Sequence, residues 1–171
     1  FFFREEALAT FEEIMKSAKK HHPESKLLAI DVQKMEKVGR ELIVGSAKDP
    51  QFGSLVMVGM GGVYTNYFKD VAFGLAPLSK LEAKKMLEKT KVYTLLKGVR
   101  GEAPSDIEAV IDTLLRIALL VNDFSEIQEL DINPFFVYEE GLGVSALDVK
   151  ITLNDLKEEI TANKSDVKHS C

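Results

Sequence analysis

The sequence predicts an α+β fold, in which a largely antiparallel sheet carries helices on one face. Two observations lead to this prediction. The 171-residue chain runs as a helix, several short strands, two helices and two more strands. Neighbouring strand patterns are joined by short turn-like segments of the kind that connect hairpins. The regular β-α-β alternation of a doubly wound sheet is therefore not expected.

Residues 4–20 are predicted to form the first helix. Glu5 and Glu6 fall in its first turn and Lys19 and Lys20 in its last, which suits the helix dipole. The apolar residues at intervals of three or four, which make one stripe, are Leu8, Phe11, Met15 and Ala18. The segment His21-His22-Pro23 ends the pattern, because a proline disfavours helical backbone before it.

Four strands are predicted in the next part of the chain. Turn-like segments rich in Gly, Pro and Asp separate them, as in 36–39 and 49–53, and Pro77 follows the last. The predicted ranges are 27–35, 41–46, 54–58 and 71–75.

Two helices are predicted after these strands. The first covers about 80–92, with Ser79 as its N-cap. The second begins after Pro104, where Ser105 and Glu108 have the spacing of a capping box. Its apolar positions make a wide core-facing stripe: Ile107, Val110, Ile111, Leu114, Leu115, Ala118 and Val121.

The C-terminal part is predicted to be a hairpin. Residues 127–138 form one strand, which Pro134 interrupts, and 144–151 form the returning strand across the turn at 139–143. Residues 154–171 become polar and are expected to form a short helix and a frayed tail.

Composition narrows the class of protein. A net charge of −5 argues against sequence-independent nucleic-acid binding, which depends on excess Lys and Arg. A single cysteine, Cys171, excludes a disulfide framework and a Cys-rich zinc site. No apolar run reaches the length of a membrane span, so a cytoplasmic protein with neither nucleic acid nor membrane as partner is expected.

The sharpest chemical feature is a row of oxygen-bearing side chains in the last predicted hairpin. Glu129, Asp131 and Asn133 alternate along one strand and therefore share a face. If the two strands pair, Asp148 comes alongside. Mg2+ binds through one or two carboxylates plus nucleotide phosphates, so the cluster suits such an ion. An exposed acidic face on an edge hairpin is the alternative.

Three further segments could bind a phosphate or nucleotide, and each has a plain structural alternative. The run Gly59-Met60-Gly61-Gly62 lets backbone N–H groups approach a ligand, or makes a tight turn. Glu41, entering a strand, can accept hydrogen bonds from ribose or be a solvated charge. Arg100, between Gly98 and Gly101, can bind an oxyanion or belong to a surface loop.

Taken together and in order, these segments resemble the ATP-grasp domain of ADP-forming acyl-CoA synthetases. The resemblance is strongest to the β subunit of ADP-forming acetate–CoA ligase, a relative of the succinyl-CoA synthetase β subunit. It covers most of residues 27–151. The matching stretches are 32–35, 39–45, 49–53, 59–63, 68–71, 96–101, 129–134 and 147–150.

The resemblance implies a role for particular residues. Gln33, Lys34 and Met35 fall on the family's adenine-binding hinge, and Glu41 falls on its ribose-binding glutamate. Asn133 and Asp148 fall on the Mg2+ ligands, with Asp131 close by. Arg100 falls in a loop near the phosphoryl-transfer centre and is the expected catalytic residue. The implied cofactors are ATP or ADP and Mg2+.

The resemblance also implies a domain plan. Residues 1–26 are expected to be the end of the first ATP-grasp subdomain, whose phosphate-binding Lys and His-Lys-Ser segment are not in the sequence. Residues 27–153 are the second subdomain, and 154–171 the C-terminal helix and tail. Relatives often have Glu where Asn66 stands, so catalysis at that position is open.

The implied function is the nucleotide-binding β component of an ADP-forming acyl-CoA synthetase, a ligase. It would make ATP from acyl-CoA, ADP and phosphate through a phosphohistidine. The implied partner is an α subunit or domain with the CoA site and that histidine, in a hetero-oligomer. Two alternatives stay open: a non-catalytic sensing module, as in a fused protein acetyltransferase, and a structural scaffold.

Overall fold

The computed structural model describes residues 4–62 and 70–154. The chain divides into two compact units, Phe1–Lys37 and Val38–Cys171, and each is described by itself. Asn66 and the predicted C-terminal helix lie outside the described residues, so those expectations stay predictions. The predicted subdomain boundary after residue 26 also stays a prediction.

The first unit contains helix α1, Arg4–His21, as predicted. No residue of α1 is buried. The predicted strand at 27–35 is wrong: the segment forms no strand, because no backbone in the described residues pairs with it. Ile30 and Val32 instead line a hollow of about 290 Å³ together with Phe11 and Ile14 of α1.

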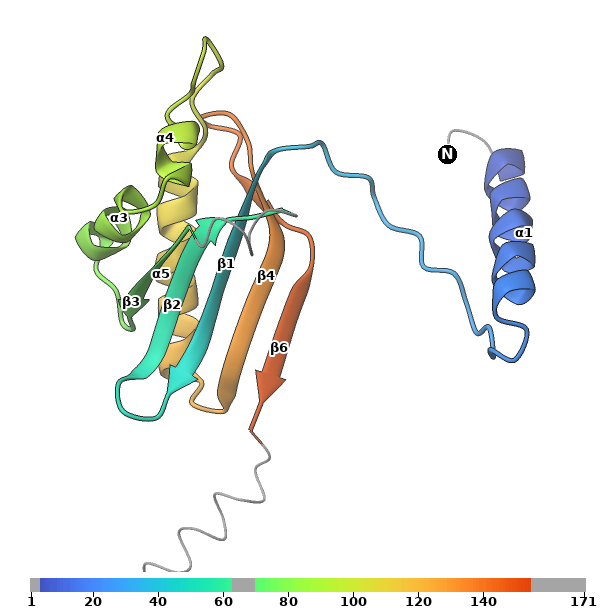
Figure 1. The fold of residues 1–171 in the computed structure, drawn as a ribbon, viewed down its shortest axis with the longest axis horizontal. Coiled ribbons are helices and arrows are strands. Elements are labelled where there is room, and N and C mark those ends of the chain that lie inside the picture. The colour runs from blue at the N-terminus through green and yellow to red at the C-terminus, as the bar shows by residue number, and fades with distance from the viewer. Residues whose placement is uncertain (1–3, 63–69, 155–171) are drawn as a thin grey trace, which may run out of the picture. The chain divides into compact units, whose positions relative to one another are not determined.

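The second unit is built on an antiparallel sheet (Figure 1). Its strand order is β3-β2-β1-β4-β5, and β6 also pairs with β4. The antiparallel sheet is the one predicted, although the returning strand of the last hairpin is divided into β5 and β6. The strands are β1 Arg40–Asp49, β2 Gly53–Met60, β3 Val71–Leu75, β4 Ile127–Val137, β5 Val144–Ala146 and β6 Val149–Leu153.

Helix α3, Lys80–Glu88, begins with the cap that the sequence predicts. The Ser79 hydroxyl accepts from the Glu82 N–H, and the Glu82 carboxylate accepts from the Ser79 N–H at 2.8 Å. The predicted range 80–92 is wrong at its end, because a separate helix α4, Val92–Leu96, follows. Thr90 ends α3 by donating its hydroxyl to the Leu87 carbonyl at 2.7 Å.

Helix α5, Ile107–Asp123, starts where predicted but with a different cap. The N-cap is Asp106, whose Oδ1 accepts from the Ala109 N–H at 3.0 Å. The predicted Ser105 capping box is wrong, because Ser105 is buried and its backbone bridges to Glu139 of the hairpin turn.

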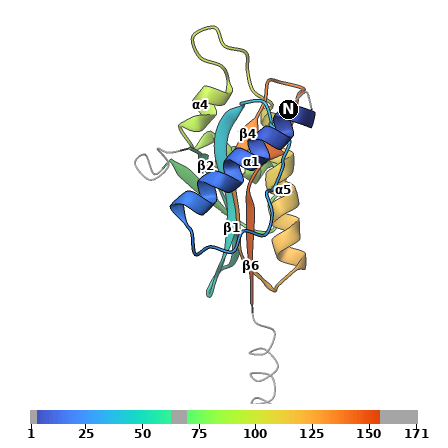
Figure 2. The same ribbon diagram turned by 90° about the vertical axis from the view of Figure 1, so that its right-hand side faces the viewer.

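The helices cover one face of the sheet, as predicted, and Figure 2 shows α5 lying along that face. The core lies between them. Its largest fully buried side chains come from the sheet and from the three helices that the structure describes in the second unit: Phe135, Leu42, Leu87, Leu96, Ile111, Leu114, Val44, Val56, Val58, Val110 and Val137. The opposite face of the sheet has no helix of the second unit over it, within the described residues.

Candidate functional site

The candidate site lies on the face of the sheet that the helices leave open. Along β4, Leu130 and Ile132 are buried on the helix side. Glu129, Asp131 and Asn133 alternate with them and are partly or fully exposed. The predicted alternation is therefore present.

A bulge in β4 lies at Asn133. Leu42 pairs with Phe135 and Val44 pairs with Ile132, so Asn133 and Pro134 together face the one residue Ile43 of β1. A bulge of this kind bends the strand and re-aims a side chain. The sequence-derived interruption at Pro134 is this bulge, and the strand continues through it.

Asp148 comes beside the bulge from the other arm of the hairpin. The Asn133 N–H donates to the Asp148 carbonyl at 3.1 Å, and the Leu147 N–H donates to the Pro134 carbonyl at 3.2 Å. Asp148 lies in the break between β5 and β6, where its side chain is exposed. Asp131 lies directly opposite Lys150 of β6. The structure therefore brings Asn133 and Asp148 together, with Asp131 two positions away on the strand.

These side chains have donor chemistry that fits a hard cation. Among the residues that the structure describes, the side chains of Asp131, Asn133 and Asp148 make no hydrogen bond or ion pair. Nowhere in the described part of the chain do three or more His, Cys, Asp or Glu side chains form a group that could bind a metal ion by itself. One amide and one carboxylate leave open positions for water and phosphate, as Mg2+ sites that share their ion with a nucleotide do.

Glu41 lies on the open face at the start of β1. Its carbonyl accepts from the Gly61 N–H at 3.0 Å. Its carboxylate lies against Gly62, because a Cβ on Gly62 would meet Glu41 Oε2 at 2.6 Å. Gly62 has φ 79°, which suits glycine. The run 59–62 was expected either to approach a ligand or to make a tight turn, and at Gly62 the glycine is explained by its packing against the Glu41 carboxylate.

Arg100 lies at the tip of the connection between α4 and α5. It is exposed, and its φ of 54° makes it a left-handed residue between Gly98 and Gly101, whose φ values are 84° and 85°. In the described part of the chain Arg100 is the one residue other than glycine with a positive φ. Because this backbone region is costly for a side chain, such residues concentrate at functional sites.

The predicted adenine hinge belongs to the first unit. Gln33 donates to Asp31 Oδ2 at 2.7 Å, and Lys34 pairs with Glu36 Oε1 at 2.8 Å. Met35 is almost fully exposed. The other predicted site residues belong to the second unit: Glu41, Arg100, Asp131, Asn133 and Asp148. Within that unit the structure brings the predicted metal ligands together.

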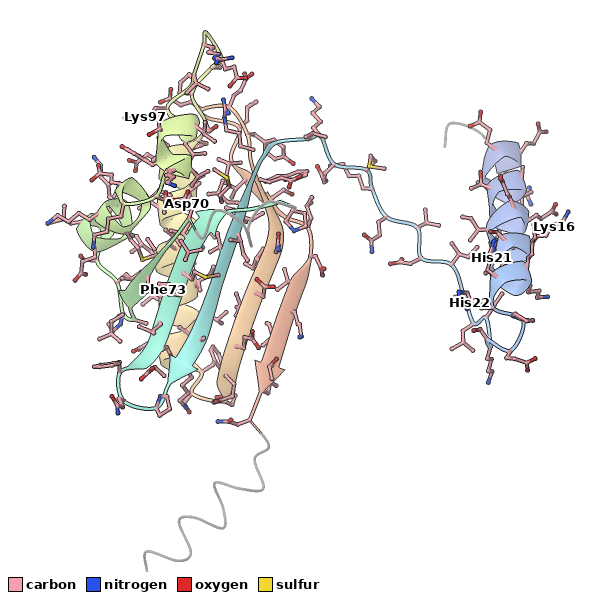
Figure 3. All side chains as sticks on the ribbon, viewed as in Figure 1. Lys16, His21, His22, Asp70, Phe73 and Lys97 are labelled. Atoms are coloured by element: carbon pink, nitrogen blue, oxygen red, sulfur yellow. The ribbon has the colours of Figure 1, made fainter. Side chains whose placement is uncertain are left out.

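Sequence reasoning missed three polar residues that connect elements of the second unit. The first is Asp70, which is buried and is labelled in Figure 3. Its carboxylate accepts from the N–H groups of Lys91 and Val92 at the start of α4. Asp106 Oδ2 accepts from the N–H groups of Gly141 and Gly143, both at 3.0 Å. The two glycines of the 139–143 turn, whose N–H groups need an acceptor, were only a weak sequence signal for the role of Asp106.

The third missed residue is Arg40. Its Nη2 donates to Glu102 Oε2 at 2.7 Å, and its Nε donates to Ser105 Oγ at 3.0 Å. The partners lie 62 and 65 residues away in the sequence. No local pattern in the chain could have shown this contact.

An antiparallel sheet with helices on one face, and with carboxylate and amide oxygens on the other, is the arrangement expected of a nucleotide- and metal-binding domain. The chain matches the family described as "ATP-grasp domain" over residues 3–153, and it belongs to that family. No helix of the described residues is long and apolar enough to span a membrane.

Among curated relatives, the chain is similar to the β subunit of an ADP-forming acetate–CoA ligase II from Pyrococcus furiosus. The two are 42% identical over 150 residues, which is 87% of this chain and 64% of the relative. It is also 46% identical, over 84% of its length, to an ADP-forming 4-hydroxybutyrate–CoA ligase of Nitrosopumilus maritimus, of which the match covers 20%. The chain thus spans less than two thirds of these relatives.

The chain is also similar to solved structures of related enzymes. An acetyl-coenzyme A synthetase 1 from Ca. Korarchaeum cryptofilum, with coenzyme A, acetyl-coenzyme A and a phosphorylated phosphohistidine segment, superposes with a TM-score of 0.81. Its identity is 40%, over 90% of this chain and 68% of that one. A second crystal of that enzyme contains coenzyme A and Mg-AMPPCP; it matches with a TM-score of 0.67 and 44% identity, over 70% of this chain and 55% of that one.

Proposed function

We propose that this chain is the nucleotide- and Mg2+-binding β component of an ADP-forming acyl-CoA synthetase. The observation that carries the proposal is the pairing of Asn133 with Asp148 beside a bulge on the open face. Relatives at 41–46% identity are named as ADP-forming ligases, which supports a ligase over a sensing module.

In this proposal the site joins a phosphoryl group to ADP. An oxygen of the ADP β-phosphate attacks the phosphorus of a phosphohistidine, and the N–P bond breaks to give ATP and free histidine. The Korarchaeum complexes support this, because they contain a phosphohistidine segment and a magnesium-bound ATP analogue. That histidine belongs, in the proposal, to an α-type subunit or domain of a hetero-oligomer.

Each residue of the second unit then has a defined share. Asn133 and Asp148, with Asp131 close by, would hold Mg2+, which neutralises phosphate charge when bound. Glu41 would accept hydrogen bonds from the ribose hydroxyls. Arg100 would stabilise the transferring phosphoryl group. Gln33, Lys34 and Met35 would contact the adenine through their backbone.

The names of the relatives also support the proposal that nucleotide binding and acyl-group selection belong to different parts of such enzymes. Their names specify different acids: acetate, 4-hydroxybutyrate and, at 35% identity, ferulate. A domain that is similar in all of them would bind the shared nucleotide, and the acyl group would be selected elsewhere.

We also propose a cytoplasmic location, because a single terminal cysteine is typical of a reducing compartment.

The test is synthesis of ATP from acetyl-CoA, ADP and phosphate by the protein assembled with its α-type partner. We expect Mg2+-dependent ATP formation that Asn133→Ala lowers by about tenfold or more, since removing one ligand of a charged group costs about 1.5–3 kcal/mol. Asn122→Ala, on the exposed end of α5, is the control and should have normal activity. A wild-type assembly that neither binds Mg·ADP nor makes ATP would overturn the proposal.

A further inference from the structure

The connection between α4 and α5 is a shaped loop, which we call the Arg100 loop (residues 97–103). It starts where α4 ends, at Lys97, whose Nζ lies 5.1 Å from the centre of the Tyr93 ring (Figure 3). Glu102 N–H donates to the Val99 carbonyl at 3.1 Å. A Cβ on Gly98 would meet the Glu102 carbonyl at 2.5 Å, so the two ends of the loop touch.

The far end of the Arg100 loop is held by Arg40, from the first residue of β1. The two bonds leave neighbouring nitrogens of one guanidinium, toward Glu102 at 2.7 Å and Ser105 at 3.0 Å. The Arg40 side chain is 26% exposed, so this pair is less exposed to solvent than the two other ion pairs described in the second unit, in which both side chains are at least 60% exposed. A planar fork with fixed N–H directions defines the position of both partners, which a lysine cannot do.

Ser105 is itself fixed from other sides. Its N–H donates to the Leu96 carbonyl at 2.8 Å, and the Asp106 N–H donates to the Tyr138 carbonyl at 2.9 Å. Ser105 is therefore held in place by the rest of the unit, while Glu102 belongs to the Arg100 loop. Because Arg40 bonds to both, it connects the loop to a fixed part of the structure.

We propose that Arg40 is a positioning residue that fixes the Arg100 loop against the start of β1. The residue after Arg40 is Glu41, so one short backbone segment sets the place of both the Glu41 carboxylate and the loop that carries Arg100. The tie between Arg40 and the loop stands on geometry alone. Its effect on catalysis rests on the proposed function, in which Arg100 contacts the transferring phosphoryl group.

The first test measures the loop without any activity. We expect Arg40→Gln to speed hydrogen–deuterium exchange of the amides at 98–103 by about fivefold or more, because exchange follows local opening. Glu102→Gln removes the same ion pair from an exposed position and should give a smaller increase, and Arg40→Lys an intermediate one. Arg116→Gln, which breaks an exposed pair with Asp112 on α5, is the matched control and should leave the loop unchanged. Unchanged exchange in both Arg40→Gln and Glu102→Gln would overturn the proposal.

The second test is a double-mutant cycle on ATP synthesis by the assembled enzyme. We expect Arg40→Gln to lower kcat by about tenfold with little change in the KM for ADP, since misplacing a reacting group mainly slows chemistry. In an Arg100→Ala background, Arg40→Gln should have no further effect. Arg40→Lys should recover part of kcat.

The outcomes separate the two proposals. Faster exchange with independent, multiplying effects on kcat would overturn Arg40 as a positioning residue for Arg100. Normal kcat in Arg100→Ala would remove Arg100 from the proposed function and overturn the catalytic part of this inference. An assembly that makes no ATP at all would refute the proposed function, while the exchange experiment would still decide whether Arg40 holds the loop.

Discussion

The two faces of the sheet in the second unit are built for different purposes. The helix-covered face carries Phe135, Leu42 and Val44, all of which are fully buried. The open face carries Glu41, Asp131 and Asn133, with Phe73 of β3 half exposed among them. Both faces come from the same strands, because alternate residues point to opposite sides.

The difference indicates where stability resides and where the proposed binding site lies. The covered face excludes water and supplies most of the hydrophobic stabilisation. On the open face, Asp131, Asn133 and Asp148 carry side-chain oxygens that make no hydrogen bond or ion pair within the described residues. Substitutions should therefore separate cleanly into those that unfold the protein and those that only weaken binding.

The largest expected effect comes from the covered face. Phe135→Ala should lower the free energy of unfolding by about 3–5 kcal/mol, because it leaves a cavity in a packed core. Urea denaturation measures this. Phe73→Ala, at a side chain that is 57% exposed, is the matched control and should cost about 1 kcal/mol or less. Equal losses would mean that the open face is as well packed as the covered one.

An intermediate effect is expected at the N-terminus of α5, where Asp106 is the cap. Asp106→Ala should cost about 2 kcal/mol, because it removes the cap of α5 and leaves the turn N–H groups of Gly141 and Gly143 without an acceptor. Thermal denaturation at pH 7 measures the loss. Asp112→Ala, further along α5 with an exposed partner, should change stability much less. A loss in Asp106→Ala no greater than that in Asp112→Ala would contradict this role.

The smallest expected effect depends on pH and lies at the solvent-exposed cap of α3. The Ser79 hydroxyl and N–H bind the charged Glu82 carboxylate and lower its pKa. Since the folded pKa lies below the unfolded one, this contribution is present above the ordinary glutamate pKa of 4.5 and is lost as the pH falls through the folded value. The melting temperatures of wild type and Glu82→Gln should therefore differ slightly at pH 7 and converge in acid. A difference that grows in acid would reverse the sign of the account.

Much of this arrangement could be predicted from the sequence. The apolar stripe of α5 and the alternation from Glu129 to Asn133 are local patterns with a fixed period, and both are present in the structure. Strand β3 was predicted with its observed bounds, 71–75. Each of these depends on the chemistry of neighbouring residues alone.

The rest could not be predicted because it depends on partners that are distant in the sequence. The segment 27–35 has the composition of a strand but no pairing partner in the described residues. Ser105 has the spacing of a cap, yet Arg40 and the hairpin engage it, and its neighbour Asp106 takes the cap. The bulge that presents Asn133 exists only in the register between β1 and β4.

The most direct test of the account is the affinity for ADP as a function of Mg2+, measured by titration calorimetry on the protein assembled with the proposed α-type partner. Asp148→Asn should weaken Mg2+-dependent ADP binding by about tenfold or more and leave the melting temperature unchanged, because its side chain is exposed and makes no hydrogen bond or ion pair within the described residues. Asp123→Asn, an exposed aspartate at the end of α5, should bind as the wild type does. Equal affinity and equal Mg2+ dependence in Asp148→Asn and wild type would contradict the claim that the open face is the nucleotide–metal site.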